Sequence, residues 1–285
     1  MAAYWGTIEG VPQRLDDRLN RMMVDFMRDM MATVNTCGVD SMECYYSTAW
    51  NDDMIADAVL DGANVELWSV HGPYGKHFDP SSPDEAVRRS SLEGFTSALR
   101  FAERIGAKVL VAHPGANIEY DVSLSERLKF AASTLKQVAQ IAGGLGISVA
   151  VEPLPRNEPG CRLEHVLTVV DEIDMPNVGI NFDVNHVFPP EEVPSMIRKA
   201  GELILSVHIS DQDGQERHWL PFEGLLDWRA ILAAFIQVGY SGPLIYETHI
   251  RDVANCDAVG RAVADNYAKL RQLEPVREGI RPHAE

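Results

Sequence analysis

Six apolar runs of this chain end on a residue that can transfer a proton or bind a metal ion. The six terminal residues, in chain order, are His71, His113, Glu152, Asp183, His208 and Glu247. Each run is short and rich in Val, Ile and Leu, as expected for a strand buried on both faces. A polar side chain at the rim of a core is costly unless it has a partner. Because the polar residue stands each time at the carboxyl end, we expect these strands to point at one shared site.

The runs alternate with amphipathic segments, which predicts repeated strand–helix units. The expected strands are 4–8, 41–46, 65–71, 108–113, 147–152, 178–183, 203–208 and 243–247, and the expected helices are 16–35, 52–61, 85–105, 124–142, 163–173, 191–200, 227–238 and 256–273. Eight units in about 250 residues are typical of an α/β fold, the single (β/α)8 TIM barrel, whose active site lies at the carboxyl ends of the strands. An open doubly wound sheet is the alternative, but no glycine-rich phosphate loop follows the first strand. We predict one domain over residues 1–285, with a peripheral tail from about 274.

The charge balance restricts the partners. The chain has 42 acidic and 25 basic residues and a formal net charge of −17. A protein that grips a nucleic-acid backbone normally carries a basic stripe. None is visible, so we expect no nucleic-acid partner and a small, neutral or weakly charged substrate.

Other sequence features bear on location. No window approaches the roughly 18 unbroken apolar residues of a membrane span, and the first residues do not resemble a secretory signal. The four cysteines are widely spaced, which argues against a disulfide framework or a zinc ribbon. We therefore expect a cytoplasmic protein with reduced thiols and no membrane partner.

A closed barrel would bring the ends of its last four strands together. The end residues are Glu152, Asp183, His208 and Glu247, which are three carboxylates and one imidazole. An oxygen-rich ligand set with one nitrogen suits a hard or borderline divalent ion rather than a soft one. We expect Mn²⁺, with Mg²⁺, Co²⁺ or Zn²⁺ as alternatives.

Between residues 65 and 249 the chain resembles the xylose isomerase-like TIM barrel superfamily, which includes sugar phosphate isomerases/epimerases and the endonuclease IV group. The matching segments are VHGPY, AHPGA, VEPLP, FDVNH, HISDQDG followed by ERHWLPFEG, and YETH. The resemblance implies that Glu152, Asp183, His208 and Glu247 bind the metal. In the ketose 3-epimerase branch it implies that Glu152 and Glu247 are also the acid/base groups. It further implies substrate-contacting roles, which we expect for His71, His113, His186, Arg217 and His218, and relatives of this kind often form dimers or tetramers.

The expected activity is isomerisation or epimerisation of a sugar or sugar derivative through an enediolate intermediate. One carboxylate removes the proton beside a carbonyl; a second returns it to the opposite face for epimerisation, or to the adjacent carbon for isomerisation. A leaving group on the neighbouring carbon would make the same site a lyase or dehydratase of an oxidised sugar, a 3-oxo-glycoside or a cyclitol. A binding protein that lacks catalysis is a further alternative, although it would not need two glutamates.

An abasic-site nuclease is also an alternative, because a candidate stands at each of the nine zinc-ligand positions of endonuclease IV. They are His71, His113, Glu152, Asp183, His186, His208, Glu216, His218 and Glu247. Asp is usual where Glu216 stands, and the acidic charge argues against DNA binding.

Three further features are candidates for supporting roles. Glu43, in the expected second strand, is placed to reach the site. Asp211, just past His208, is a candidate to orient that imidazole. The polar loop around Lys76 and His77 is long enough to act as a lid.

Overall fold

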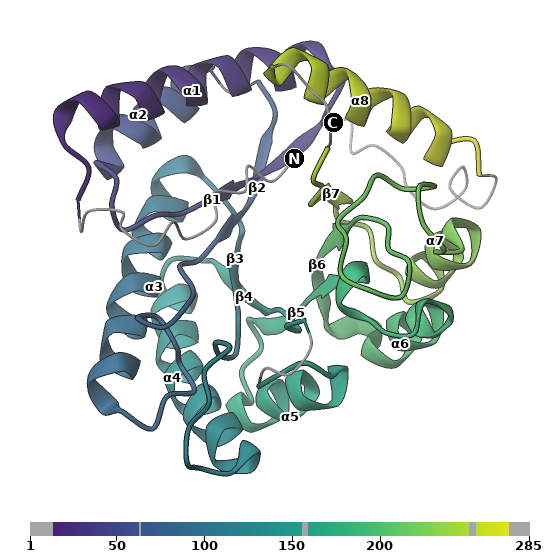
Figure 1. Cartoon of the computed structure of the whole chain (residues 1–285). Coiled ribbons are helices and arrows are strands. Elements are labelled where there is room, and N and C mark those ends of the chain that lie inside the picture. Colours follow the sequence, from purple (N-terminus) through teal and green to yellow (C-terminus); the bar gives the residue numbers. More distant parts are fainter. Residues whose placement is uncertain (1–13, 63, 156–158, 251–254, 274–285) are drawn as a thin grey trace.

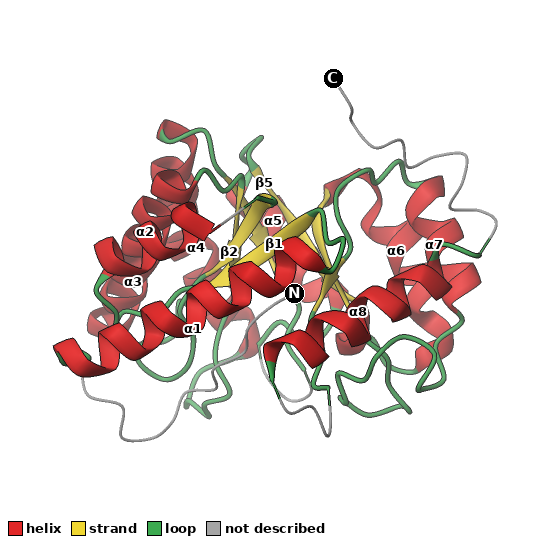
Figure 2. Cartoon of the chain, turned by 90° about the horizontal axis from the view of Figure 1, so that it is seen from above, coloured by secondary structure: helices red, strands yellow, loops and turns green. Residues whose placement is uncertain are grey.

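The computed structural model of the chain describes residues 14–62, 64–155, 159–250 and 255–273. Within these ranges, seven parallel strands form one sheet in the order of the sequence, and eight α-helices surround it (Figures 1 and 2). The strands are β1 (Ser41–Tyr45), β2 (Glu66–His71), β3 (Val109–Ala112), β4 (Ser148–Val151), β5 (Val178–Asp183), β6 (Ile204–Ile209) and β7 (Ile245–Tyr246). The helices are α1 (Asp17–Thr36), α2 (Asp52–Gly62), α3 (Glu85–Ile105), α4 (Leu124–Gly144), α5 (Leu163–Ile173), α6 (Val193–Ala200), α7 (Trp228–Gln237) and α8 (Cys256–Leu270).

The sheet curves into a nearly closed barrel, so the predicted TIM-barrel fold is confirmed (Figure 1). Strand order follows chain order without a reversal, unlike an open doubly wound sheet, whose order reverses at a switch point. The first expected strand, 4–8, and the expected tail from about 274 lie outside the described residues. In the described part of the chain, none of the helices has the length and apolar character needed to cross a bilayer.

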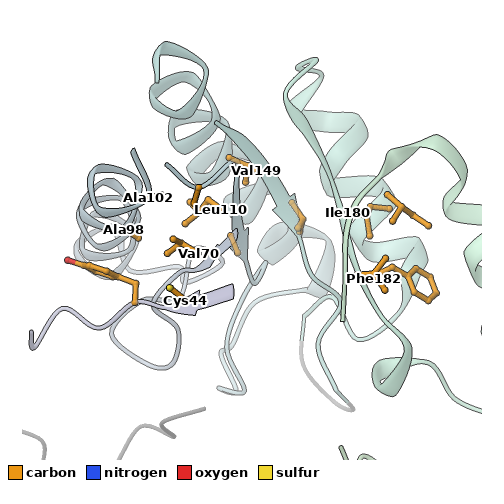
Figure 3. Close-up of a cluster of buried hydrophobic side chains, with 14 of the residues drawn as sticks. Cys44, Val70, Ala98, Ala102, Leu110, Val149, Ile180 and Phe182 are labelled. Carbon is orange, nitrogen blue, oxygen red and sulfur yellow. The ribbon is translucent and has the colours of Figure 1, made fainter. Parts of the chain in front are cut away.

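Side-chain alternation along the strands separates two buried regions. Outward-facing residues pack between the barrel and its helices; Figure 3 shows Val70 and Leu110 beside Ala98 and Ala102 of α3. Alternate residues face the barrel axis, where Val109, Val111 and Ala150 form a separate small cluster with Trp68 and Leu205. This interior cluster is apolar, whereas the positions that follow toward the carboxyl ends of the strands are polar.

The loop between β2 and α3 is fixed over its second half by a buried ion pair. Arg127 of α4 donates from Nη2 to Asp79 Oδ2 at 3.1 Å and to Ser81 Oγ at 2.8 Å. The same guanidinium also donates to the backbone carbonyls of Ile118 and Ala116, in the next loop. Asp79 is fully buried, whereas Lys76 and His77, earlier in this loop, are exposed. A lid role therefore stays a prediction for residues 72–78 only.

Replacing Asp79 with Ala is expected to lower the free energy of unfolding by about 3–5 kcal/mol, because the Arg127 charge would remain buried without its partner. Urea denaturation measures this loss. Asp57→Ala, which breaks an exposed ion pair with Arg104 on the helical surface, is the control and should change stability little. Equal stabilities for Asp79→Ala and the control would show that the buried pair does not hold the loop.

Candidate metal and active site

Four of the predicted site residues converge at the carboxyl ends of the strands. Glu152 directly follows β4, Asp183 ends β5, His208 lies near the end of β6 and Glu247 directly follows β7. Each offers a ligand atom, and these four atoms all lie within 4.8 Å of one another. All four side chains are buried, with exposed fractions of 1%, 0%, 0% and 9%. The structure thus brings together three carboxylates and one imidazole.

The imidazole of His208 lies at the centre of this cluster. Its Nδ1 is 3.1 Å from Glu152 Oε1 and 3.2 Å from Glu247 Oε2. Its other ring nitrogen, Nε2, is 3.1 Å from Oε1 of Glu43 on β1. Glu43 was expected to reach the site, and the structure places it there.

Three buried carboxylate oxygens of the cluster, Glu152 Oε2, Asp183 Oδ2 and Glu247 Oε2, make no well-aligned hydrogen bond in the described part of the protein. Each instead faces a histidine nitrogen, at 3.3, 3.4 and 3.2 Å respectively. Buried, unpaired carboxylate oxygens are unfavourable unless a cation or a proton neutralises them. A divalent ion satisfies several such oxygens at once. The residues present therefore fit a metal site.

Four histidines, at or just beyond strand ends and in the loops that follow, extend the cluster on both sides. His71 and His113, at the ends of β2 and β3, form a second possible metal-binding group with Glu152. His186, at the end of the short 3-10 helix Val184–His186, and His218 form a third with Asp183. Glu152 and Asp183 are therefore shared between groups, and four of the five predicted substrate-contacting residues flank the central cluster.

The fifth, Arg217, has other partners in the structure. Its guanidinium donates to both carboxylate oxygens of Asp213, at 2.9 and 3.1 Å, and lies 5.4 Å from the ring centre of Trp219. Arg217 belongs to none of the three metal-binding groups. Its contact with substrate stays a prediction, and the N–H groups of the guanidinium that do not bond Asp213 could make it.

Burial and neighbouring charges shift the pKa values of the cluster, and the direction of the net shift differs between residues. Burial raises the pKa of Asp183 to about 7, and the charges of Glu247 and Glu152 add to this rise. For His71, burial lowers the pKa, but the hydrogen bond and charge of Glu152 outweigh it and raise the pKa to about 9. For His113, burial dominates and lowers the pKa to about 4. Without a metal, the cluster therefore holds protons on some of its groups at neutral pH.

Asp211 does not orient His208 as expected, because its carboxylate serves the loop after β6. It accepts hydrogen bonds from the backbone N–H groups of Gln212, Phe222 and Leu226 and from Trp228 Nε1. These bonds fold the segment 211–226 that carries His218. Asp211 acts on the site only through the shape of this loop.

An aromatic wall beside the cluster was not foreseen from the sequence. Tyr45 stacks on His71 with ring centres 5.7 Å apart, and Tyr74 meets the edges of His71 and His113 at 5.8 and 5.5 Å. The sequence did contain a pattern that could have predicted Tyr45. Side chains alternate between the two faces of a strand, so the segment MECYY places Tyr45 on the same face as Glu43.

Comparison with known proteins identifies the family. Residues 31–273 match the family model described as xylose isomerase-like TIM barrel. An uncharacterized protein of Methanocaldococcus jannaschii, MJ1311, is 32% identical over 200 residues, which are 67% of this chain and 68% of that protein. D-psicose 3-epimerase of Ruminiclostridium cellulolyticum is 23% identical over 223 residues, covering 76% of this chain and 72% of the enzyme.

Solved structures show the same architecture. The crystal structure of a D-tagatose 3-epimerase-like protein matches with a TM-score of 0.69 and 30% identity, over 84% of this chain and 90% of that one. A 3-keto-D-glucoside 4-epimerase from E. coli matches with a TM-score of 0.72 and 20% identity, over 87% and 95% of the two chains. The fold and the matched family model agree: this chain belongs to the xylose isomerase-like TIM barrel family.

Proposed function

We propose that the protein is a divalent-metal-dependent epimerase or isomerase of a sugar or sugar derivative. The observation that carries this proposal is the approach of Glu152 and Glu247, from β4 and β7, to the same ring nitrogen of His208, at 3.1 and 3.2 Å. Two buried carboxylates beside one cation site are the parts needed to move a proton next to a carbonyl. The names of relatives, among them D-psicose 3-epimerase and fructoselysine 3-epimerase, support the same chemistry.

The metal would be held by Glu152, Asp183, His208 and Glu247. When bound, a divalent ion supplies positive charge that stabilises negative charge developing on the oxygens of the substrate. The three buried carboxylate oxygens that lack a well-aligned hydrogen bond support this assignment. Mn²⁺ is our first choice, and Mg²⁺, Co²⁺ and Zn²⁺ suit the same ligand set.

The two glutamates would perform the proton transfers. Glu152 and Glu247 come from strands separated by β5 and β6, so their carboxylates approach the cluster from different sides. One takes the proton from the carbon beside the carbonyl, and the other returns a proton to the opposite face. Both side chains are buried, which keeps bulk water from competing for the transferred proton.

The flanking histidines would bind the hydroxyl groups of the substrate. His71, His113, His186 and His218 surround the cluster with ring nitrogens that can donate or accept hydrogen bonds. Tyr45 and Tyr74 add an apolar surface on one side, suited to the carbon face of a sugar. A small polyol matches these groups, and the wild-type charge of −17 disfavours polyanions.

The proposal is tested by incubating metal-loaded protein with D-fructose, D-tagatose, D-psicose and L-ribulose in D₂O and recording NMR spectra. The expected result is either an epimer with deuterium on the carbon beside the original carbonyl, or an isomer with deuterium on the original carbonyl carbon. The lyase alternative is tested by adding 3-oxo-glycosides and cyclitols to this panel. Unsaturated or dehydrated products from these compounds would establish it. No exchange in any of these compounds would overturn the proposal.

A nuclease of the endonuclease IV type is the second candidate, because the described residues contain three overlapping metal-binding groups rather than one. Nine-ligand metal sites belong to that branch, and Glu216 lies 3.4 Å from His218, beside the third group. Incision of a duplex oligonucleotide carrying one abasic site tests this candidate. We expect no incision, because an acidic chain repels the phosphate backbone.

Metal affinity is expected to rise with pH. Burial lowers the pKa of His208, but the charges of Glu43, Glu152 and Glu247 outweigh it and raise the pKa well above the ordinary value. The metal-free imidazole is therefore protonated at neutral pH, and a metal ion must displace that proton. The Kd for Mn²⁺ should fall by at least about tenfold for each unit of pH between about 6 and 8, and more steeply below about 7, where Asp183 also holds a proton. Calorimetry at several pH values measures the slope, and an affinity independent of pH would contradict this account.

A further inference from the structure

Glu43 lies inside the barrel, at the ring nitrogen of His208 that faces away from the other two glutamates. Glu43 Oε1 and Oε2 are 3.1 and 3.2 Å from His208 Nε2. Glu152 and Glu247 approach Nδ1 of the same ring. His208 is thus held between carboxylates at both of its nitrogens, and only one side of the ring faces the candidate metal ligands.

The position of Glu43 depends on an irregularity between β1 and β2. The two strands pair in register up to Met42 and Leu67, and the register then shifts so that Glu43 lies opposite Ser69 rather than Trp68. Ser69 Oγ donates to Glu43 Oε2 at 2.7 Å. The bulge therefore supplies the hydroxyl that fixes Oε2, and with it the whole carboxylate, beside His208 Nε2.

Hydrophobic packing does not explain why a carboxylate is buried at position 43. Glu43 is 1% exposed, and no Lys or Arg in the described ranges forms an ion pair with it. Burying a carboxylate without a cation costs several kcal/mol, so a buried glutamate needs a charged or hydrogen-bonding partner. The ion-pair partner that the structure offers Glu43 is His208.

We propose that Glu43 is a positioning residue for the metal site, which it serves by accepting the Nε2–H of His208. This hydrogen bond fixes the rotation and the tautomer of the ring, so that the lone pair of Nδ1 faces Glu152, Asp183 and Glu247. A carboxylate behind a metal-binding histidine also makes the imidazole a stronger ligand, and loss of such a partner typically lowers metal affinity about 10- to 100-fold. The inference rests on the proposed function, since it assumes a metal at this cluster.

Two variants and one control test the inference through metal affinity, without any substrate. Glu43→Leu removes the acceptor, whereas Glu43→Gln keeps an oxygen that can accept from Nε2–H and loses only the charge. Ser206→Ala is the matched control: Ser206 lies on β6 two residues before His208, is fully buried, and its hydroxyl has no hydrogen-bond partner among the described residues. The Kd for Mn²⁺ and Co²⁺ is measured by competition with a chromogenic chelator, and the visible spectrum of bound Co²⁺ reports on the ligand geometry.

Glu43→Leu is expected to weaken metal binding about 10- to 100-fold and to change the Co²⁺ spectrum, with a smaller loss for Glu43→Gln and none for Ser206→Ala. Glu43→Leu leaves the Nε2–H of His208 buried without an acceptor, so the metal-free variant should melt at a lower temperature than wild type. Glu43→Gln keeps the acceptor and should melt close to wild type yet bind Mn²⁺ more weakly, which a purely structural role for Glu43 would not produce. If Glu43→Leu does not fold, the isosteric Glu43→Gln still decides the question by its weaker binding. If both Glu43 variants bind metal with wild-type affinity, the role of Glu43 is overturned but the proposed function is not. If the wild-type protein binds no metal, the proposed function itself is overturned.

Discussion

Glu247→Gln is expected to lower kcat by about 10³- to 10⁴-fold, because glutamine keeps the shape of the side chain but cannot accept or return a proton. Glu152→Gln should have an effect of the same size. Burial raises the pKa of Glu247, but the charge and hydrogen bond of His208 outweigh it and hold the pKa well below the ordinary range, so this carboxylate is ionised at neutral pH. Steady-state rates on the ketose turned over by the wild-type protein measure the loss.

Proton exchange separates an acid/base role from simple loss of the metal. A variant that lacks one of two opposed acid/base groups can still exchange a proton on one face of the substrate. Each single variant, loaded with metal, should therefore incorporate deuterium from D₂O into one epimer while interconverting the two epimers very slowly. The control is Glu66→Gln on β2, an exposed carboxylate paired with Lys108, which should turn over at the wild-type rate. Near-wild-type epimerisation by both Glu152→Gln and Glu247→Gln would exclude them as the acid/base pair.

Removal of the metal is expected to lower the melting temperature by about 8–16 °C. A ligand present at about 1,000 times its Kd stabilises the folded state by about 4 kcal/mol, and in a domain of this size each kcal/mol shifts the melting temperature by about 2–4 °C. The physical cause is the cluster of buried carboxylates at Glu152, Asp183 and Glu247, whose mutual repulsion the ion relieves.

Differential scanning calorimetry of chelator-treated protein, with and without added Mn²⁺, measures this shift. Asp183→Asn is the matched variant, because it removes one carboxylate and so reduces both the repulsion and the response to Mn²⁺. Identical melting temperatures for the treated and the Mn²⁺-supplemented wild-type protein would contradict a structural metal contact at this cluster.

The fold was predictable because its signal is local and repeated. Alternation of short apolar runs with amphipathic segments indicated parallel strands, and the expected strand 178–183 coincides with β5. The last strand is shorter than expected: 243–247 was predicted, and β7 is Ile245–Tyr246. Pro243 lacks the N–H group that a paired strand residue donates, which shortens the ladder at this end.

The site was predictable only in part. The convergence of the four strand-end residues follows from the strand topology, whereas the individual contacts depend on loop conformation and on the register between strands. Ends of neighbouring parallel strands must meet, so the proximity of Glu152, Asp183, His208 and Glu247 could be expected. The contact between Glu43 and His208 depends on the bulge beside Met42, which no sequence pattern indicated. The pairing of Arg217 with Asp213 likewise depends on the conformation of a loop. Propensity and periodicity do not encode these tertiary details.

Metal content per chain, determined by elemental analysis of protein purified without chelators, tests the central claim most directly. We expect about one divalent ion per chain in the wild-type protein and almost none in a His208→Ala variant that remains folded. Protein that binds no divalent ion, even after incubation with Mn²⁺, Co²⁺ or Zn²⁺, would contradict the assignment of Glu152, Asp183, His208 and Glu247 as a metal site. Three zinc ions per chain would contradict the single-ion epimerase and favour the nuclease instead.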